Sequence, residues 1–184
     1  MKPVGRDYRI YGERIYLRPI TEADTDMVLE WRNSRAVVEN FIYRKPVTKD
    51  GHLNWLKNKV DKGLVHQFII CDNVEDTPYG CVYLQNFDEE NNKAESGIFL
   101  GNTNRRSGIG TEAESLILEY CFDKLELHKV TARVLSYNEA SLRLHEKAGY
   151  KKEAYLKDEL YIDGKYVDLV LYGIVNSDYI KARS

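Results

Sequence analysis

Arg105-Arg106-Ser107-Gly108-Ile109-Gly110 is the most informative segment of this 184-residue chain. A strand-like run, residues 96–100, comes before it, and apolar residues at helical spacing follow it. The first N–H groups of a helix have no partner inside the helix and carry partial positive charge, and glycines let an anion approach the backbone. The sequence therefore predicts a phosphate-binding turn between a strand and a helix, to which Arg105 and Arg106 add cations and Thr111 a hydroxyl group.

The spacing of the glycines excludes two common nucleotide-binding loops. A Walker loop needs Gly-Lys-Ser/Thr after its glycines, and here Thr111-Glu112 follows Gly110. The dinucleotide fingerprint needs a third glycine and a βαβ unit, and the sequence has neither at this place. Two glycines alone are typical of many plain loops. The whole pattern R-x-x-G-x-G, between a strand and an amphipathic helix, is much more specific.

The rest of the chain divides into helices and strands by periodicity and capping residues. Before the turn we expect a strand, two helices and an antiparallel meander of three strands, at residues 14–19, 21–32, 48–63, 65–71, 79–86 and 94–100. After it we expect a helix, a strand, a helix and a hairpin closed by Asp163-Gly164, at residues 110–124, 129–135, 138–148, 155–162 and 166–175. This order indicates an α+β, or mixed α/β, domain with a largely antiparallel sheet.

Composition and charge limit the classes of function. Hydrophobic residues make up 43% of the chain, and 27 basic against 29 acidic residues give a net charge of −2, which argues against nucleic acid as a partner. The three cysteines are widely spaced, and no Cys/His cluster has the spacing of a metal site, so we expect no metal. With no signal peptide and no bilayer-length apolar run, the sequence favours the cytoplasm over a membrane. We expect a single domain over residues 1–184, with a flexible segment at residues 1–12.

A second segment supports the glycine turn. Residues 138–150, Asn-Glu-Ala-Ser-Leu-Arg-Leu-His-Glu-Lys-Ala-Gly-Tyr, end in a Gly-aromatic pair. Together with R-x-x-G-x-G, this segment resembles the GNAT superfamily of N-acetyltransferases, whose pyrophosphate motif and closing Gly-aromatic pair lie at the same separation. The resemblance covers nearly the whole chain, and it is greatest to the Rim-type acetyltransferases and to the amino-sugar N-acetyltransferases of the pseudaminic-acid pathway.

The resemblance implies a fold and a co-substrate. The fold is a central, mostly antiparallel, splayed sheet flanked by helices, and the co-substrate is acetyl-CoA. Backbone N–H groups would hold the CoA pyrophosphate at Ser107, Gly108, Ile109, Gly110 and Thr111, with Arg105 and Arg106 on its flanks. The backbone of Phe99 and Leu100 would pair with the pantetheine arm, and Asn138 would hydrogen-bond that arm.

Acetyl transfer to an amine needs a base, because a primary amine is protonated at neutral pH, with a pKa near ~10. Glu95, on the strand beside the cofactor, is one candidate, and a solvated carboxylate is the alternative. His145 stands where the superfamily usually has the tyrosine that protonates the CoA sulfur. An imidazolium can donate that proton, and a structural histidine is the alternative. His52 is a further candidate, as a base or as a hydrogen-bond partner of the acceptor.

The acceptor site is expected on the first two helices. Trp31-Arg32-Asn33 ends the first, and His52 and Trp55 lie three residues apart on one face of the second. This combination resembles N-acetyltransferases of nucleotide-linked amino sugars, where Arg32 would meet a phosphate and a tryptophan would stack on a sugar or base; core packing is the alternative for both tryptophans.

Other acceptors stay open. Gly110-Thr111-Glu112-Ala113 resembles Rim-type enzymes that acetylate ribosomal proteins, and a polyamine acetyltransferase is a third option. A CoA-binding sensor or an interaction module is the alternative outside enzymes. As partners we expect a small-molecule amine and a second copy of the chain in a homodimer, and neither nucleic acid nor a membrane.

Overall fold

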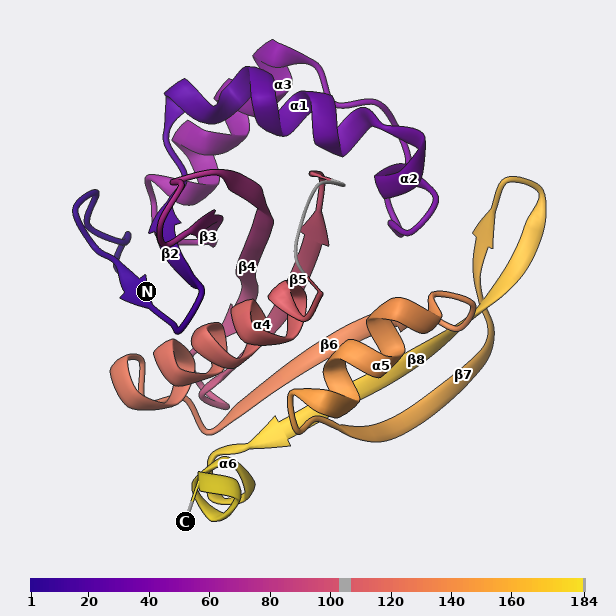
Figure 1. Cartoon of the computed structure of the whole chain (residues 1–184). Coiled ribbons are helices and arrows are strands. Elements are labelled where there is room, and N and C mark those ends of the chain that lie inside the picture. The colour runs from indigo at the N-terminus through magenta and orange to yellow at the C-terminus, as the bar shows by residue number, and fades with distance from the viewer. Residues whose placement is uncertain (103–106, 184) are drawn as a thin grey trace.

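The computed structural model describes residues 1–102 and 107–183, and its strands form one eight-stranded sheet (Figure 1). Their order across the sheet is β1-β2-β3-β4-β5-β6-β8-β7. The strands are β1 Ile10–Tyr11, β2 Ile15–Pro19, β3 His66–Asp72, β4 Pro78–Asp88, β5 Lys93–Leu100, β6 Lys129–Leu135, β7 Lys151–Ile162 and β8 Lys165–Val175. Neighbours run antiparallel except β5 and β6, which run parallel.

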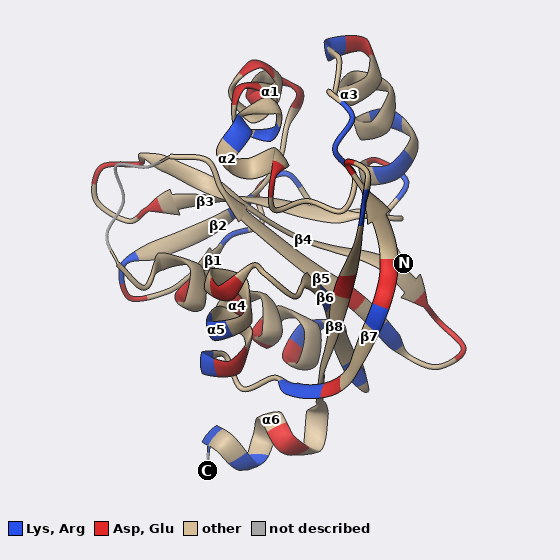
Figure 2. Ribbon diagram, turned by 90° about the vertical axis from the view of Figure 1, so that its right-hand side faces the viewer, with Lys and Arg blue, Asp and Glu red and all other residues tan. Residues whose placement is uncertain are grey.

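Helices cover both faces of the sheet. Figure 2 shows α1, α2 and α3 on one face and α4 and α5 on the other, with α6 beyond the sheet at the C-terminal end. The helices are α1 Thr25–Asn33, α2 Arg35–Val38, α3 Lys49–Trp55, α4 Ile109–Glu119, α5 Glu139–Lys147 and α6 Asn176–Arg183. Within the described residues, none of them combines the length and the apolar character that crossing a bilayer requires.

The alternation of β-strand side chains divides the core into two layers. In β3, Phe68 and Ile70 pack with α4, whereas Ile69 and Cys71 pack with the layer under α1–α3. All four residues are almost completely buried, so β3 is apolar on both faces. The sheet is thereby fixed between the two helical layers, and Cys71, Cys81 and Cys121 are free, buried core residues, in agreement with the sequence.

The sheet separates between β5 and β6. The two strands pair only over the first half of β5, from Lys93↔Lys129 to Ser96↔Ala132. Beyond that point, among the described residues, the sheet partner of residues 97–100 is β4 and that of residues 133–135 is β8. Figure 1 shows the two strands diverging toward the end of β5 that leads into α4. The splayed sheet implied by the resemblance is therefore confirmed.

The predicted elements are confirmed with small differences at their ends. Thr21 and Asp24 form the predicted cap: the Asp24 carboxylate accepts from the Thr21 N–H at 2.8 Å and from its hydroxyl at 2.9 Å. The chain there begins as a 3-10 turn, Glu22–Asp24, and this shifts Ala23 from the predicted buried face to the surface. Helices α3 and α4 each continue as a π-helical turn, at Leu56–Val60 and Tyr120–Lys124.

The N-terminal segment has defined contacts. Its Lys2 carbonyl lies 2.9 Å from His66 Nε2, and the segment then forms β1 against β2. Too few residues form β1 for hydrophobic alternation to be seen in the sequence. The flexibility expected for residues 1–12 stays a prediction.

Candidate active site

The glycine turn begins helix α4. Gly108 is the N-cap residue, with φ of 86°, in the left-handed region that favours glycine. Glu112 N–H donates to the Gly108 carbonyl at 3.1 Å, so the N–H groups of residues 109–111 precede the first helical hydrogen bond. A side chain on Gly110 would stand 2.7 Å from Leu144 Cδ1, so this glycine allows α4 to approach α5. Arg105 and Arg106 lie outside the described residues.

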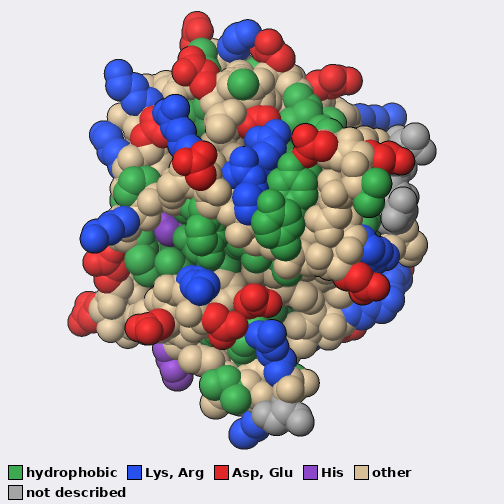
Figure 3. Space-filling model, turned by 60° about the vertical axis from the view of Figure 1, so that its left-hand side comes forward, with side chains coloured by type: hydrophobic (Ala, Val, Ile, Leu, Met, Phe, Trp, Pro, Cys, Tyr) green, Lys and Arg blue, Asp and Glu red, His purple; other side chains and the backbone are tan. Residues whose placement is uncertain are grey.

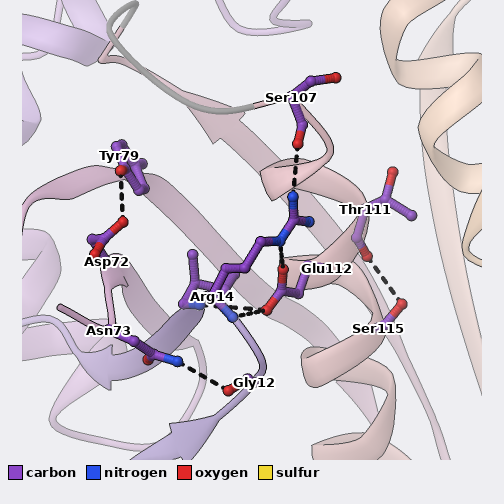
Figure 4. Close-up of polar contacts among 10 residues, drawn as sticks. Gly12, Arg14, Asp72, Asn73, Tyr79, Ser107, Thr111, Glu112 and Ser115 are labelled. Atoms are coloured by element: carbon purple, nitrogen blue, oxygen red, sulfur yellow. Dashed lines mark hydrogen bonds and ion pairs between the residues drawn. The ribbon is translucent and has the colours of Figure 1, made fainter.

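Arg14, at the start of β2, holds this turn in place (Figure 4). Its Nη1 donates to the Ser107 carbonyl at 2.9 Å, and its Nε donates to Glu112 Oε2 at 2.7 Å. The backbone N–H of Arg14 donates to the other carboxylate oxygen, Oε1, at 2.8 Å. One side chain from the far end of the sequence therefore fixes both the turn and the first turn of α4.

A cavity of about 760 Å³ lies where β5 and β6 separate. This volume is typical of small-molecule sites. Its lining includes Val28 and Arg32 of α1, residues 40–43 and 46–48, Gly51, His52 and Trp55 of α3, Tyr83 and Gln85, residues 95–99, residues 133–135, and Asn138, Ser141 and His145. The lining takes residues from both α3 and α5, which cover opposite faces of the sheet (Figure 2). A second cavity, about 930 Å³, lies under the N-terminal segment, and no predicted site residue lines it.

Two arginines and one glutamate are the charged residues described in the lining. Arg133 donates from Nε and Nη2 to the Glu95 carboxylate at 3.0 and 3.1 Å, and the Gln85 and Asn86 amides donate to the same carboxylate at 3.0 and 3.3 Å. With four donors occupying its oxygens, Glu95 is placed as the counter-ion of Arg133. This favours an electrostatic role over the predicted role of general base.

Arg32 has no such counter-ion among the described residues. Its guanidinium carbon lies 3.8 Å from the centroid of the Phe41 ring, and Nη2 donates to the Tyr43 carbonyl. Nη1 is buried and has no hydrogen-bond partner in the described part of the chain. Burial lowers the pKa of Arg32 from its ordinary value, because desolvation disfavours the cation. The group retains a capacity to bind an anion.

His52 lies in the wall formed by α3. Only 5% of its surface is exposed, and its ring stacks on Trp55. Nδ1 is 3.3 Å from Thr25 Oγ1, whereas Nε2 is buried without a partner among the described residues. Burial lowers the pKa of His52, and the charge of Asp24 opposes this effect. A neutral imidazole with one uncommitted nitrogen can accept a proton.

His145 approaches the same cavity from α5. Its Nδ1 lies 2.8 Å from the Ser141 carbonyl oxygen, which can only accept, so Nδ1 carries the hydrogen. Nε2 is buried and unpartnered among the described residues, and the ring stacks on Tyr172 with centroids 5.7 Å apart. Asn138 also lines the cavity, but its side-chain oxygen accepts from the Ser141 N–H at 3.1 Å and caps α5. Its amide nitrogen is the group left for a ligand.

The remaining predicted residues divide between the cavity and the core. Phe99 and Trp55 line the cavity, and Leu100 packs in the core instead. Trp31 packs over Gly101, so closely that a Cβ there would be 2.0 Å from Trp31 Cγ, and it is absent from the lining. Asn33 exchanges two hydrogen bonds with the Val47 backbone, at 2.9 and 2.8 Å. This arrangement favours packing over Gly101 for Trp31, and shaping of the α2–α3 loop for Asn33, over the predicted substrate contact.

Several residues of the site were missed by sequence reasoning. Arg14 directly precedes β2 and Arg133 lies in β6, so the placement of strands in the sheet decides what each of them touches. Ser96, in the lining, donates to Glu114 Oε1 at 2.8 Å, and the Tyr150 hydroxyl donates to the same oxygen at 2.7 Å. This buried group ties β5, α4 and the end of α5 together where the strands separate. The Gly-aromatic pair at residues 149–150 was the one signal in the sequence that pointed to it.

The described residues fit an elongated ligand with an anionic end. The left-handed Gly108 leaves the start of α4 without a side chain, and three residues of the cavity lining, Arg32, His52 and His145, each carry a buried nitrogen without a hydrogen-bond partner among the described residues. In the described part of the chain, no three His, Cys, Asp or Glu side chains gather in a way that could hold a metal ion.

Comparisons with known proteins agree with this geometry. Residues 14–151 match the acetyltransferase (GNAT) domain. A probable N-acetyltransferase of Bacillus subtilis, YjcK, is 31% identical over 91% of this chain and 97% of its own length. A putative ribosomal N-acetyltransferase of the same organism, YdaF, is 29% identical over 74% and 71%. The crystal structure of spermidine N-acetyltransferase from Vibrio cholerae, in complex with CoA and spermine, superposes with a TM-score of 0.85 at 22% identity, over 92% of this chain and 99% of that one.

Proposed function

This chain belongs to the GNAT family and is an acetyl-CoA-dependent N-acetyltransferase, and we propose that its acceptor is a small-molecule amine that also carries a phosphate, such as a nucleotide-linked amino sugar. Acetyl transfer to an amine is common to the family. The acceptor is the open question, because the relatives carry names as different as ribosomal and spermidine acetyltransferase.

The buried, unpartnered Nη1 of Arg32 is the observation that carries the choice of acceptor. A buried guanidinium without a carboxylate is costly unless a ligand supplies the negative charge. Guanidinium groups bind phosphate with paired hydrogen bonds. The flat surface of Trp55, beside His52 in the same wall, suits a sugar ring or a base. Arg32 and Trp55 together therefore favour a phosphorylated, ring-containing amine.

The charge of the cavity disfavours a polyamine. Among the described lining residues, two arginines face one glutamate, and that glutamate already pairs with Arg133. A polyamine carries several positive charges and needs free carboxylates to bind. On the face shown in Figure 3, acidic and basic side chains interleave around apolar patches, so the described residues of that face form no acidic patch that would attract a polyamine. The polyamine option therefore rests on the names of relatives alone.

Different residues of the chain are suited to the separate steps of acetyl transfer. When bound, acetyl-CoA supplies the acetyl group as a thioester. In the tautomer in which His52 Nδ1 donates to Thr25 Oγ1, the Nε2 lone pair is free to take a proton from the attacking amine. Residues 97–100 of β5 pair with β4 but no longer with β6, and backbone N–H groups on that open edge are suited to stabilise developing charge on an oxygen.

His145 is suited to donate a proton to the departing sulfur of CoA. Since its Nδ1–H is held by the Ser141 carbonyl, Nε2 donates a proton only in the imidazolium form. His52, which takes up a proton, and His145, which gives one, lie on opposite sides of the cavity, on α3 and α5. The acceptor would therefore enter from the α1–α3 side and the co-substrate from the α4–α5 side.

A thiol-release screen tests the acceptor. Free thiol is measured after mixing enzyme and acetyl-CoA with a UDP-linked 4-amino sugar, with the same amino sugar lacking the nucleotide, with spermidine, or with an N-terminal peptide. We expect the highest kcat/KM with the UDP-linked amine. Arg32→Met should raise KM for it roughly 10- to 100-fold, since a desolvated charge pair is lost, and should leave the nucleotide-free sugar little changed. Faster turnover of spermidine or of the peptide would refute the proposed acceptor.

A further inference from the structure

We propose that Arg14 is a positioning residue for acetyl-CoA: it orients the Gly108 N–H toward the diphosphate and neutralises Glu112, whose charge would otherwise repel that diphosphate. Nothing in the sequence pattern marks Arg14, which is 93 residues before Ser107 and 98 before Glu112. The inference concerns the cofactor end of the site and is independent of which amine is acetylated.

Arg14 sets the direction of the peptide group between Ser107 and Gly108. Arg14 Nη1 donates to the Ser107 carbonyl at 2.9 Å, so that carbonyl points toward β2 (Figure 4). In a trans peptide the carbonyl oxygen and the following N–H point in opposite directions. The Gly108 N–H is therefore turned away from Arg14, and it directly precedes the N–H groups of residues 109–111, which have no partner inside the helix. Without Arg14, this peptide loses the contact that sets its direction.

Arg14 also neutralises the charge of Glu112. A carboxylate in the first turn stabilises a helix, but it repels an anion that binds at the same end. Here three donors hold the carboxylate against β2: Arg14 N–H at 2.8 Å, Arg14 Nε at 2.7 Å and Ile15 N–H at 3.3 Å. Its side chain is only 14% exposed. Arg14 therefore cancels the charge and keeps it on the β2 side of α4.

The neighbouring backbone is shaped to admit this carboxylate. A Cβ on Gly12 would stand 2.7 Å from Glu112 Oε1, so a side chain at position 12 would displace it. On the other side of the guanidinium, Arg14 Nη2 is 3.2 Å from the place of a Cβ on Gly108. Gly12, between β1 and β2, and Gly108, at the start of α4, thus allow one arginine to contact both the acid and the turn.

The test separates cofactor positioning from general stability. Arg14→Met, Glu112→Gln and the double variant are compared for CoA affinity by calorimetry, and for kcat/KM with acetyl-CoA and with S-acetylpantetheine, which lacks the diphosphate. We expect Arg14→Met to weaken CoA binding roughly 5- to 30-fold, the range of favourable charge effects at a helix end, and to leave S-acetylpantetheine turnover within about twofold. Glu112→Gln should recover part of the loss in the Arg14→Met background, because it removes the uncompensated charge.

Arg35→Met is the matched control, since Arg35 also pairs with a glutamate, Glu39, but on the exposed helix α2. It should change none of these quantities. Unchanged CoA affinity in Arg14→Met, or an equal loss with both thioesters, would overturn the positioning role. Failure of Glu112→Gln to recover any affinity would overturn the neutralisation. If Arg14→Met does not fold, Arg14→Lys keeps the charge but cannot make both side-chain contacts, and it must show the same selective loss with acetyl-CoA.

Discussion

The rings of His52 and Trp55 lie stacked in the wall of the cavity, with centroids 5.6 Å apart and planes inclined by 26°. The stack, together with the 3.3 Å contact from His52 Nδ1 to Thr25 Oγ1, fixes the imidazole in one orientation. Burial lowers the pKa of His52, so the ring is neutral at pH 7. A neutral, oriented imidazole is what proton removal from an amine requires.

Replacing His52 with Gln should lower kcat roughly 100-fold or more, in the range that general base catalysis supplies, with little change in KM for acetyl-CoA. In the unchanged enzyme, activity should fall with acid only below about pH 6.5, because the lowered pKa moves protonation to lower pH. Steady-state kinetics between pH 5 and 9 provide the measurement. His128, exposed and outside the cavity, is the control: His128→Gln should behave like the unchanged enzyme. A His52→Gln variant with full kcat would remove the base assignment.

His145→Phe should lower kcat more than it raises KM for acetyl-CoA, because the aromatic stack on Tyr172 is preserved while the proton donor is lost. His145→Tyr should retain turnover, since a phenol hydroxyl can donate a proton to the departing sulfur in place of the imidazolium. Thermal unfolding of both variants gives the stability to compare. Equal losses of stability and activity in His145→Phe, with no recovery in His145→Tyr, would make His145 a structural residue.

Stability should fall as pH decreases below about 6.5, the ordinary pKa of histidine in the unfolded chain. His66 is 1% exposed, and burial, its largest influence, lowers its pKa; the Lys2 carbonyl opposes this and the N-terminal ammonium adds to it. A group whose folded pKa is lowered binds its proton first in the unfolded state, so acid favours unfolding. The slope reaches at most about 1.4 kcal/mol per pH unit for each such histidine.

Urea unfolding at pH 7.5, 6.5 and 5.5 measures this slope. His66→Gln should lower stability at every pH, because it loses the packing of the ring against Phe87 and Tyr120, yet its slope should be smaller. His128→Gln should keep the slope, since that side chain is exposed. A slope unchanged by His66→Gln would show that other groups cause the acid effect.

Most of the fold could be predicted from the sequence because its signals are local. The cap at Thr48, whose Oγ1 accepts from the Gly51 N–H at 3.1 Å, and the hairpin turn, where Asp163 and Gly164 have φ of 50° and 82°, depend only on neighbouring residues. The short elements β1 and α2 were missed, since two and four residues show no periodicity. α6 was missed as well, because its eight residues have almost no amphipathic pattern to mark them.

The site was predicted less completely, because its contacts join distant parts of the chain. The motif located the turn and Gly108, but not Arg14, which lies just before β2 and reaches the turn only because β2 packs beside α4. Glu95 and His52 were equal candidates by residue type; only the register, which pairs Glu95 with Thr131 in β6 and brings Arg133 onto its carboxylate, separates them. Trp31 and Trp55 are likewise alike by residue type, and only the structure separates them: Trp31 packs over Gly101, whereas Trp55 lines the cavity. The homodimer and the cellular compartment stay predictions.

Calorimetric titration of CoA into the Gly108→Asp variant and into the unchanged protein tests whether the turn at Gly108 binds the diphosphate. Gly164→Asp is the matched control, because Gly164 also has a positive φ, of 82°, but lies in the open hairpin turn with nothing within 4 Å of an added Cβ. Both changes should cost about 1 kcal/mol in backbone strain. We predict that Gly108→Asp, folded by circular dichroism, shows no detectable binding of CoA, while Gly164→Asp binds it normally. Binding by Gly108→Asp with unchanged affinity would contradict the placement of the diphosphate at the start of α4.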